Sequence, residues 1–493
     1  MLPVGAQRDD RVGMSARSYE QLSSLIARVA EVQVRLQLPG GAVPDPIITD
    51  IVFDSRRVVP GCLFVCLRGA HSDGHTFADA AVSAGAVALV VDHQVFTSEP
   101  VAQLVVSDTR RAMGYLSSAF FHNPSRALTI VGITGTNGKT TTAHILSCAL
   151  EALGSPTGVI GTLSGAHTTP EAPDLQRRLA GFVEQGCSSV AMEVSSHALA
   201  LDRVLGTRFR VGVFTNLGRD HLDLHQTQER YFAAKARLFQ ADLTDHGVVN
   251  TDDVHGRLLV DVADIPLTTF CLDDAVGLGV SAFEHSYTWR GERIHVGLGG
   301  RFNASNSLAA ATTLGVLGYS PSDIAGALAT TTAVSGRFEP IEAGQDFVVI
   351  VDYAHTPDAM VEVLSAARAV AGEHRLIVVF GCGGDRDPEK RPLMGLAAAT
   401  LADHLVITSD NPRSEPPLAI INDVIGGVPG EYREKAVVEP DRLEAIAAAL
   451  RAAGPGDVVV IAGKGHETTQ TIRSTVSPFD DRSVARALLE RMS

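Results

Sequence analysis

The residues best suited to chemistry lie in one stretch, residues 129–142. A β-branched run, Thr129, Ile130, Val131 and Ile133, predicts a buried parallel strand, and the segment that begins at Thr140 predicts a helix. A glycine-containing loop separates the two. A strand, a glycine-rich loop and a helix N-terminus together form a layout that binds phosphate, because backbone N–H groups and the positive end of the helix face the anion.

The loop itself predicts how a nucleotide would be held. Lys139 stands where it can reach the β- and γ-phosphates, and the Thr140 hydroxyl can ligate Mg²⁺. The full pattern G-x-x-x-x-G-K-[ST] is not met, because position 133 is Ile, so an ordinary strand-to-helix turn is the alternative. The flanking strand and helix favour nucleotide binding by the loop residues, which are Gly135, Thr136, Asn137, Gly138, Lys139, Thr140 and Thr141.

Two further polar clusters follow predicted strands. A predicted strand over residues 190–194 leads into the polar segment that begins at Glu193. A second predicted strand, over residues 211–215, is followed by a segment that contains His221. Ligands of open α/β sheets bind beyond the carboxyl ends of the strands. One polar strand end is unremarkable, but three at the same edge favour a site for a metal and a nucleotide.

Composition limits the class of protein. The 493 residues predict roughly three domains of about 150 residues each. A formal charge of −15 argues against broad nucleic-acid binding, and no apolar run approaches the roughly 20 residues of a membrane span. The six cysteines include no C-x-x-C pair, which predicts free thiols in a reducing cytoplasm rather than disulfides or zinc: Cys62, Cys66, Cys148, Cys187, Cys271 and Cys382.

The order of elements predicts an α/β protein of three domains after a disordered polar tail, residues 1–17. We expect a small N-terminal α/β domain over residues 18–124, a central P-loop ATPase-type domain with a parallel-rich sheet over 125–338, and a Rossmann-like doubly wound domain over 339–493. The first of these is expected to begin with a helix near residue 18. The third contains predicted strands 347–351, 375–380, 404–408 and 457–462 and helices 357–370, 391–400 and 440–452.

Several other polar residues have both an ordinary and a functional interpretation. Lys235 lies on a predicted helix over residues 231–240, where a lone lysine is usually solvated. Asn303 begins another predicted helix and would serve there as a cap. The segment Asp410-Asn-Pro-Arg413 follows a strand, but Asn-Pro is also a natural start for a turn.

Taken together, the motifs resemble the Mur ligases, ATP-dependent amide-forming enzymes of peptidoglycan precursor synthesis. The resemblance runs from about residue 50 to residue 467. It rests on Gly135-Thr-Asn-Gly-Lys-Thr-Thr141, Glu193-Val-Ser-Ser-His197, Thr215-Asn-Leu-Gly-Arg-Asp-His221, Tyr231-Phe-Ala-Ala-Lys235, Asn303-Ala-Ser-Asn306, Gly336-Arg337 and Asp352-Tyr-Ala-His-Thr-Pro357. Five further motifs resemble the diaminopimelate-adding type within this family. They are Asp54-Ser-Arg56, Thr168-Thr-Pro170, Gly381-Cys-Gly-Gly-Asp-Arg386, Asp410-Asn-Pro-Arg413 and Gly463-Lys-Gly-His-Glu467.

The resemblance implies a reaction and a set of catalytic residues. ATP phosphorylates the side-chain carboxylate of D-glutamate in UDP-N-acetylmuramoyl-L-alanyl-D-glutamate, and the amine of meso-2,6-diaminopimelate attacks the acyl phosphate. The implied Mg²⁺ ligands are Thr140, Glu193, His221 and Lys235 as a carbamate, although Mg²⁺ prefers oxygen and His221 is chemically the least expected of them. Catalytic roles are implied for Lys139, Glu193, His221, Lys235 and Arg337, and further ATP contacts for Asn303, Asn306, Arg337 and Asp352.

The resemblance also implies two substrate sites. For the UDP-sugar peptide the matching positions are Phe53, Ser55, Ala70, His71, Ser72, His167, Thr168, Thr169, Ser195, Leu201 and Arg203. Two of them depart from the family's better-known pattern, because His167 stands where Asn is expected and Leu201 where a polar Gln is expected. For diaminopimelate the matching positions are Arg386, Asp410, Asn411, Pro412, Arg413, Gly463 and Glu467.

Three alternatives remain from the sequence. The chain could be an L-lysine-adding ligase of the same type, a folylpolyglutamate synthetase-like ligase, or a P-loop switch that binds nucleotide without forming amides. The separate motifs of the third domain, together with Glu193, His221 and Lys235, argue against the switch. We also expect a cytoplasmic monomer that binds no nucleic acid and does not insert into membranes.

Overall fold

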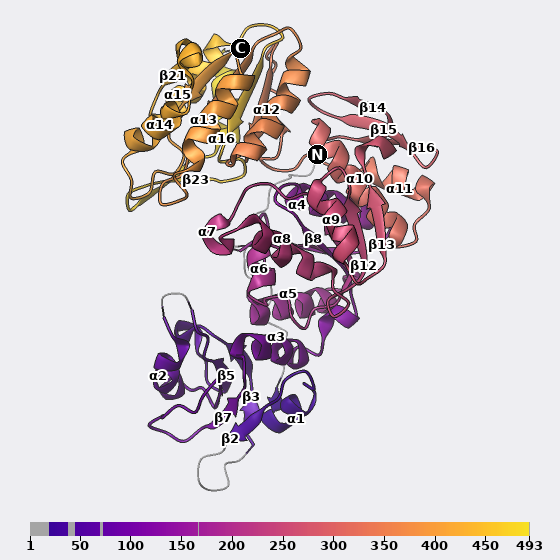
Figure 1. The fold of residues 1–493 in the computed structure, drawn as a ribbon, viewed down its shortest axis with the longest axis vertical. Helices are drawn as coiled ribbons and strands as arrows, with labels where there is room; N and C mark the ends of the chain where they lie inside the picture. Colours follow the sequence, from indigo (N-terminus) through magenta and orange to yellow (C-terminus); the bar gives the residue numbers. More distant parts are fainter. Residues whose placement is uncertain (1–18, 38–44, 70–71, 166, 493) are drawn as a thin grey trace.

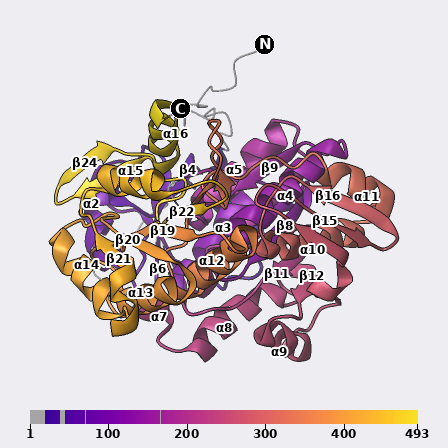
Figure 2. The same cartoon turned by 90° about the horizontal axis from the view of Figure 1, so that it is seen from above.

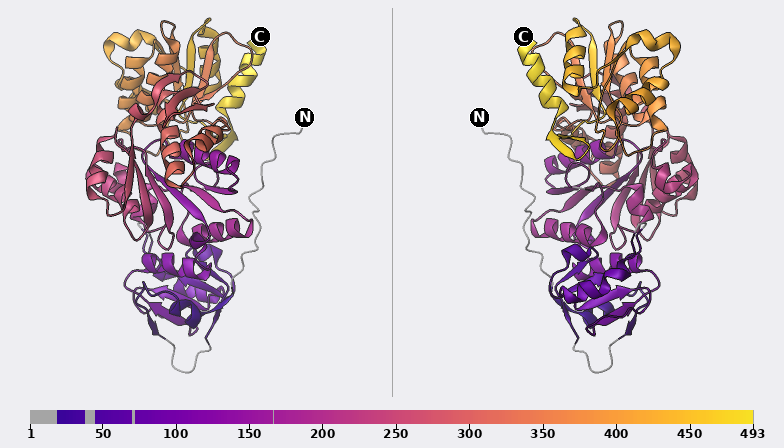
Figure 3. Two further views of the ribbon diagram at one scale, coloured as in Figure 1. Left: turned by 90° about the vertical axis from the view of Figure 1, so that its right-hand side faces the viewer. Right: turned by 90° about the vertical axis from the view of Figure 1, so that its left-hand side faces the viewer.

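The computed structural model describes residues 19–37, 45–69, 72–165 and 167–492. The predicted tail, residues 1–17, and two predicted contact residues, Ala70 and His71, lie outside the described residues. The chain forms three α/β units stacked end to end, with the N-terminal unit at one end and the C-terminal unit at the other (Figures 1 and 3).

The N-terminal unit contains a five-stranded sheet in the order β2-β7-β6-β5-β4. Its strands are β2 (Arg35–Gln37), β4 (Asp50–Val52), β5 (Cys62–Val65), β6 (Ala88–Val91) and β7 (Ala102–Val105), and all pairs except β2–β7 are parallel. The expected opening helix is shorter than predicted: α1 (Leu22–Ala27) follows β1 (Glu20–Gln21), which pairs with β3 (Ile47–Ile48). Shorter helical elements of this unit are η1 (Ser55–Arg57), η2 (Gly74–Phe77) and α2 (Ala78–Ser83).

Helix α3 (Thr109–Phe120) joins this unit to the next. Asp108 caps it, because its carboxylate accepts hydrogen bonds from the backbone N–H groups of Arg110 and Arg111. The helix packs against α5 (Ala172–Glu184) of the central unit, and η3 (Pro124–Arg126) then leads into the central sheet (Figure 1).

The central sheet is entirely parallel, in the order β13-β12-β11-β8-β10-β9. Its strands are β8 (Thr129–Thr134), β9 (Thr157–Ile160), β10 (Ser189–Glu193), β11 (Phe209–Phe214), β12 (Thr244–Asn250) and β13 (Leu267–Phe270). The register pairs Glu193 with Ile133 and Phe214 with Thr134. The loops that follow β8, β10 and β11 therefore leave the sheet at the same level of the same edge.

Helices and an antiparallel ribbon cover the central sheet. One side carries α4 (Lys139–Ala152), α10 (Arg301–Val316), α11 (Pro321–Leu328) and the ribbon of β14 (Val276–Val280), β15 (His285–Trp289) and β16 (Glu292–Val296), which share one apolar core. The remaining helical elements are α6 (Ser196–Ala200), α7 (Leu222–His225), α8 (Gln228–Ala236), η4 (Arg237–Phe239), α9 (Val254–Val262) and η5 (Leu272–Asp274). Asn303 lies inside α10, which begins at Arg301, so the alternative of a helix cap is wrong.

The C-terminal sheet has the order β17-β18-β22-β19-β20-β21 and is parallel except for β17 (Glu339–Pro340). The other strands are β18 (Val348–Asp352), β19 (Leu376–Phe380), β20 (His404–Ile407), β21 (Ala436–Val438) and β22 (Val458–Ala462). Helices α12 (Pro357–Ala371), α13 (Lys390–Leu401), α14 (Pro417–Gly426), α15 (Arg442–Ala452) and α16 (Asp481–Met492) flank it (Figure 2). Between α14 and β21 stands η6 (Gly430–Lys435), and before α16 a hairpin of β23 (Thr469–Ile472) and β24 (Thr475–Pro478).

The predicted α/β class with a P-loop-type centre and a doubly wound C-terminal sheet is confirmed. The sequence pattern does not predict the antiparallel ribbon β14–β16, because β14 contains two glycines and is mostly exposed, and β16 alternates polar with apolar residues instead of forming a continuous apolar run. All six cysteines are free, as predicted. Among the described residues, no helix is both long enough and apolar enough to cross a bilayer. The exact domain limits stay predictions.

Candidate active site

A cavity of about 870 Å³ lies where the carboxyl edge of the central sheet faces the C-terminal unit. Its walls combine the loop after β8, the ends of β10 and β11, helices α8 and α10, and the segment from β18 into α12. The sequence-predicted residues that line it are Thr136, Asn137, Gly138, Lys139, Thr140, Thr141, Thr168, Glu193, Ser195, His221, Lys235, Asn306, Arg337 and Asp352. Sequence segments up to about 200 residues apart thus share one site.

The phosphate loop is held by the neighbouring strand end and by α10. The backbone N–H of Asn137 donates to the Asn216 side chain at 2.8 Å, and the Thr215 hydroxyl donates to the Asn137 carbonyl at 2.6 Å. Gly138 has a φ of +85° and caps α4, and a Cβ at this position would lie 2.4 Å from Oδ1 of Asn306. The loop therefore requires glycine here, both for its backbone and for the close packing of α10.

Two lysine side chains converge on one carbonyl oxygen of this loop. Nζ of Lys139 donates to the carbonyl of Gly135 at 2.8 Å and to that of Thr136 at 2.8 Å. Nζ of Lys235, on α8, donates to the same Gly135 carbonyl at 2.7 Å and lies 4.6 Å from the centre of the Tyr231 ring. Lys235 is only 1 % exposed. The predicted alternative, a solvated helical lysine, is therefore wrong.

This arrangement favours a neutral amine at position 235. Burial lowers the pKa of Lys235 well below its usual value, and the nearby Lys139 ammonium lowers it further, although Asp220 opposes this. Burial also lowers the pKa of Lys139, against the opposing effect of Glu193 and Asp220. A neutral, buried amine is the form of lysine that can react with an electrophile such as CO₂.

Glu193 and Thr140 form the second feature of the site. The Thr140 hydroxyl donates to the Glu193 carboxylate at 3.1 Å, and the same carboxylate accepts from the backbone N–H and the hydroxyl of Thr162 at 2.8 and 3.2 Å. Glu193 is 2 % exposed. A buried carboxylate beside a hydroxyl supplies the hard oxygen ligands that Mg²⁺ prefers. These donors fit the predicted magnesium site.

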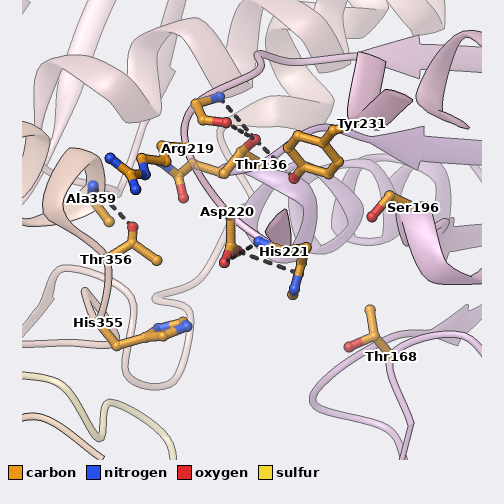
Figure 4. Close-up of polar contacts among 12 residues, drawn as sticks. Thr136, Thr168, Ser196, Arg219, Asp220, His221, Tyr231, His355, Thr356 and Ala359 are labelled. Carbon is orange, nitrogen blue, oxygen red and sulfur yellow. Dashed lines mark hydrogen bonds and ion pairs between the residues drawn. The ribbon is translucent and has the colours of Figure 1, made fainter. Parts of the chain in front are cut away.

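His221 reaches the same cavity from the loop after β11 (Figure 4). Its Nε2 lies 3.3 Å from the Asp220 carboxylate, and its ring stands edge-on to that of His197 with centroids 4.6 Å apart. Partial desolvation lowers the pKa of His221 to about 4, although Asp220 acts in the opposite direction. This shift favours the neutral imidazole, the form that can donate a lone pair to a metal.

The junction with the C-terminal unit contributes a cation, and β18 contributes a buried acid. Nη2 of Arg337 donates to the Thr140 hydroxyl at 3.3 Å, while its guanidinium lies 4.4 Å from the centre of the Tyr353 ring. The Asp352 carboxylate accepts from the backbone N–H groups of Phe338 and Ala354, each at 2.7 Å. Asp352 thereby fixes the backbone directly after Arg337.

The predicted amino-acid-binding residues form a separate cluster at the carboxyl edge of the C-terminal sheet. The Asn411 amide donates to the Glu467 carboxylate at 2.8 Å, and Nη1 of Arg413 donates to the Gly384 carbonyl at 2.6 Å. Gly463 passes so close to Asp410 that a Cβ on it would lie 2.7 Å from the carboxylate. Arg386 is exposed and flanks Gly383 together with Arg413, while Pro412 is buried.

The predicted UDP-sugar residues are divided between two units. Thr168, Thr169 and Ser195 lie together: the Thr169 hydroxyl accepts from the Ser195 N–H at 3.0 Å, and the Thr168 hydroxyl lies 3.0 Å from that of Thr162. Arg203 donates to the Thr169 carbonyl at 3.2 Å. Residues of the set that do not line the cavity are Phe53, Ser55, Ser72, the exposed His167, Thr169, Leu201 and Arg203.

Several residues of the site were not predicted individually. Thr162 follows β9 and could have been found as a fourth polar strand end at the same edge. Asp220 directly precedes His221 in the sequence. His355 of the C-terminal unit faces Asp220 across the cavity (Figure 4). Tyr231 is fully buried, and its hydroxyl lies 3.0 Å from that of Thr136. No sequence signal predicts that contact, because it joins positions 95 residues apart.

A group of potential metal ligands also lies outside this cavity, in the N-terminal unit. It consists of His75, Asp92 and His93. The Asp92 carboxylate already accepts from Nε of Arg68 at 2.7 Å, and the Asp92 N–H donates to Nε2 of His75 at 3.2 Å. Because the acid is paired and the imidazole lone pair is used, we assign no metal to this group.

Three comparisons with known proteins agree with this geometry. The Mur ligase middle domain matches residues 133–314, the Mur ligase glutamate ligase domain matches residues 336–465, and the Mur ligase family catalytic domain matches residues 47–121. These three matches cover most of the chain, including the residues that line the cavity and the C-terminal cluster except Glu467.

Individual relatives share one name, UDP-N-acetylmuramoyl-L-alanyl-D-glutamate–2,6-diaminopimelate ligase. The protein of Syntrophomonas wolfei is 43% identical over 466 residues, which cover 90% of this chain and 95% of the relative. That of Geobacillus kaustophilus is 44% identical over 472 residues, 90% of this chain and 96% of the relative. A solved structure with this name is 32% identical, has a TM-score of 0.65, and covers 92% of this chain and 97% of its own.

The position of Lys139 generates a test of nucleotide binding. Lys139→Ala should lower the turnover number by roughly 10²- to 10³-fold, because a preorganised donor at a developing negative charge contributes about 3–4 kcal/mol to the transition state. Binding of a non-hydrolysable ATP analogue, measured by calorimetry, should weaken as well. Lys435→Ala is the matched control, because Lys435 lies in η6 and does not line the cavity. Near-normal turnover by a folded Lys139→Ala variant would contradict the assignment.

Proposed function

The chain belongs to the Mur ligase family, and we propose that it is the ligase that joins meso-2,6-diaminopimelate to the D-glutamate side-chain carboxylate of UDP-N-acetylmuramoyl-L-alanyl-D-glutamate. Members of the family use ATP to form an amide and serve peptidoglycan synthesis. The observation that carries the proposal is the sequence identity of 43–44% to ligases of this name over 90% of the chain. We place the reaction in the cytoplasm and propose that the protein acts as a monomer.

The residues of the cavity support an acyl phosphate mechanism. The D-glutamate carboxylate attacks the γ-phosphorus of ATP and ADP leaves; the substrate amine then attacks the acyl carbon and phosphate departs. Phosphoryl transfer of this kind depends mainly on positioning and on neutralisation of charge. Lys139, at the phosphate loop, and Arg337, beside the Thr140 hydroxyl, would contribute positive charge, and the loop N–H groups would orient the phosphates.

A divalent cation fits the acidic side of this cavity. Glu193, the Thr140 hydroxyl and the neutral imidazole of His221 would hold Mg²⁺, which when bound neutralises phosphate charge. Lys235 as an unmodified amine offers no oxygen ligand, and its charged form is disfavoured by burial and by Lys139. Carbamylation of Lys235 would supply two oxygen atoms and a negative charge in its place. This modification is supported by the two hydrogen bonds that Nζ of Lys139 and Nζ of Lys235 donate to the same Gly135 carbonyl.

Substrate selection is assigned to the C-terminal cluster. Diaminopimelate differs from L-lysine by one carboxylate on the distal carbon, and a guanidinium can pair with this group through two hydrogen bonds. Arg413 follows Pro412 and is held by backbone bonds to the hairpin: its N–H donates to the Thr471 carbonyl at 3.1 Å, and its own carbonyl accepts from Arg473. Asp410, Asn411 and Glu467 are assigned to the ammonium end of the substrate.

The modification of Lys235 has a direct test. Protein incubated with ¹³C-labelled bicarbonate should give a carbamate signal in its ¹³C NMR spectrum, and Lys235→Ala should lose both the signal and the activity. Short carboxylic acids should restore part of the activity, because they can replace the missing oxygen ligands. Lys435→Ala should keep both signal and activity. A fully active Lys235→Ala variant without additives would refute the carbamate.

Amino-acid preference tests the function itself. The wild type should release ADP only when both the UDP-linked dipeptide and an amino acid are present, and diaminopimelate should be strongly preferred over L-lysine in a panel. Arg413→Ala should lower kcat/KM for diaminopimelate by about ten- to a hundred-fold, since a hydrogen bond to a charged group contributes roughly 1.5–3 kcal/mol. The KM for ATP should stay within about twofold.

Arg473→Ala is the matched control for this experiment, because Arg473 is exposed and touches Arg413 only through the backbone. Each alternative gives a different result. A wild-type preference for L-lysine would indicate the lysine-adding type. Glutamate ligation to a folate would indicate a folylpolyglutamate synthetase, and nucleotide binding without amide formation would indicate a switch.

A further inference from the structure

A buried ion pair lies directly behind the C-terminal cluster. Arg442, the first residue of α15, and Asp481, the first residue of α16, are 2 % and 0 % exposed. Nε of Arg442 donates to one oxygen of the Asp481 carboxylate at 2.8 Å, and Nη2 donates to the other at 2.7 Å. The guanidinium and the carboxylate thus pair in the two-bond geometry that fixes both groups in direction as well as distance.

The same guanidinium makes two further bonds, to the backbone of two different strand ends. Nη1 donates to the Ser409 carbonyl at 3.2 Å, and Nη2 donates to the Ala462 carbonyl at 3.0 Å. Ser409 is the residue before Asp410, and Ala462 is the residue before Gly463. Arg442 therefore holds the last peptide group before each of the two loops assigned to the amino acid.

These two loops depend on their mutual position. A Cβ on Gly463 would meet the Asp410 carboxylate at 2.7 Å, and the Asn411 amide bonds to Glu467 at 2.8 Å across the gap between the loops. A shift of one loop along its strand would break both contacts. In the parallel sheet, β19 stands between β20 and β22, so the strand ladder does not join these two strands directly. Arg442 bridges them.

The charge of Arg442 is secured by its surroundings. Burial by itself would lower its pKa, but Asp481, with smaller effects from Asp410 and Glu467, raises the pKa above the usual value for arginine. The carboxylates of both loops thus lie near enough to be attracted by this one cation. Such a pair is costly to bury, and replacing it by apolar side chains is often neutral or stabilising. Stability alone is therefore a weak reason for an ion pair at this position.

We propose that Arg442, fixed by Asp481, is a positioning residue for amino-acid recognition, which clamps the Asp410–Arg413 and Gly463–Glu467 loops in the one register that fits diaminopimelate. This inference rests on the proposed function, because it concerns the site assigned to that substrate. Arg442 does not touch the substrate. It acts through the carbonyl groups of Ser409 and Ala462, and Asp481 orients its guanidinium.

The test separates positioning from stability. The double variant Arg442→Met with Asp481→Leu removes both charges of the pair, so neither partner is left buried and unpaired. Its midpoint of thermal unfolding should lie within a few degrees of that of the wild type. The KM for diaminopimelate should nevertheless rise at least tenfold, discrimination against L-lysine should fall, and the KM for ATP should change by less than twofold. Unchanged KM and discrimination in this folded double variant would overturn the proposal.

A second variant covers the case in which the double variant does not fold. Arg442→Lys retains a cation opposite Asp481 but cannot direct separate donors to both carbonyls, so the KM for diaminopimelate should still rise several-fold at normal ATP affinity. Wild-type behaviour of Arg442→Lys would overturn the proposal. The matched control is Arg375→Met, which breaks the Arg375–Asp457 pair at the opposite end of β19 and β22. It should lower stability without changing either KM.

The wild type in the same assay distinguishes the two proposals from each other. Failure of the wild type to ligate diaminopimelate would refute the proposed function. Ligation by the wild type together with unaltered variants would refute the role of Arg442 alone.

Discussion

The site is organised around a single backbone oxygen, the carbonyl of Gly135, which accepts hydrogen bonds from the partly buried Lys139 side chain and the buried Lys235 side chain. Two ammonium groups this close would repel each other with little water to screen them, which favours the neutral form of the Lys235 amine beside Lys139. Under the proposed function, the triphosphate of ATP would supply negative charge opposite Lys139, and a carbamate would replace the neutral amine of Lys235 by an anion. Both groups would therefore be bound for electrostatic reasons.

The rest of the central unit brings the opposite charge to this point. The parallel register of β8, β10 and β11 places Glu193 and the loop bearing His221 at the level of the phosphate loop, so that few additional contacts are needed to assemble the site. Arg337, which lies just before the first strand of the C-terminal sheet, contacts Thr140, which already bonds to Glu193. One threonine hydroxyl therefore links the junction of the two units to the phosphate loop.

Much of this arrangement could be predicted from the sequence. Apolar β-branched runs followed by polar residues predict parallel strands and their functional edge, which is why the loop at Gly135, the acid Glu193 and the cluster at Asp410 were all recognised. The sequence pattern does not determine which polar side chains the packing of the fold will bury. Lys235 has the sequence context of a solvated residue, but the fold buries it, and Asn303 lies within a helix rather than at its cap. Tyr231 and Thr162 contribute through contacts between distant segments, which no local pattern encodes.

Transfer of oxygen tests the acyl phosphate most directly. The UDP-linked dipeptide can be prepared with ¹⁸O in the D-glutamate side-chain carboxylate and incubated with the protein, ATP and diaminopimelate, after which the released phosphate is analysed by ³¹P NMR or mass spectrometry. If that carboxylate attacks the γ-phosphorus and phosphate later leaves from the acyl carbon, each phosphate formed must carry one ¹⁸O atom. Formation of the amide with unlabelled phosphate would contradict the account.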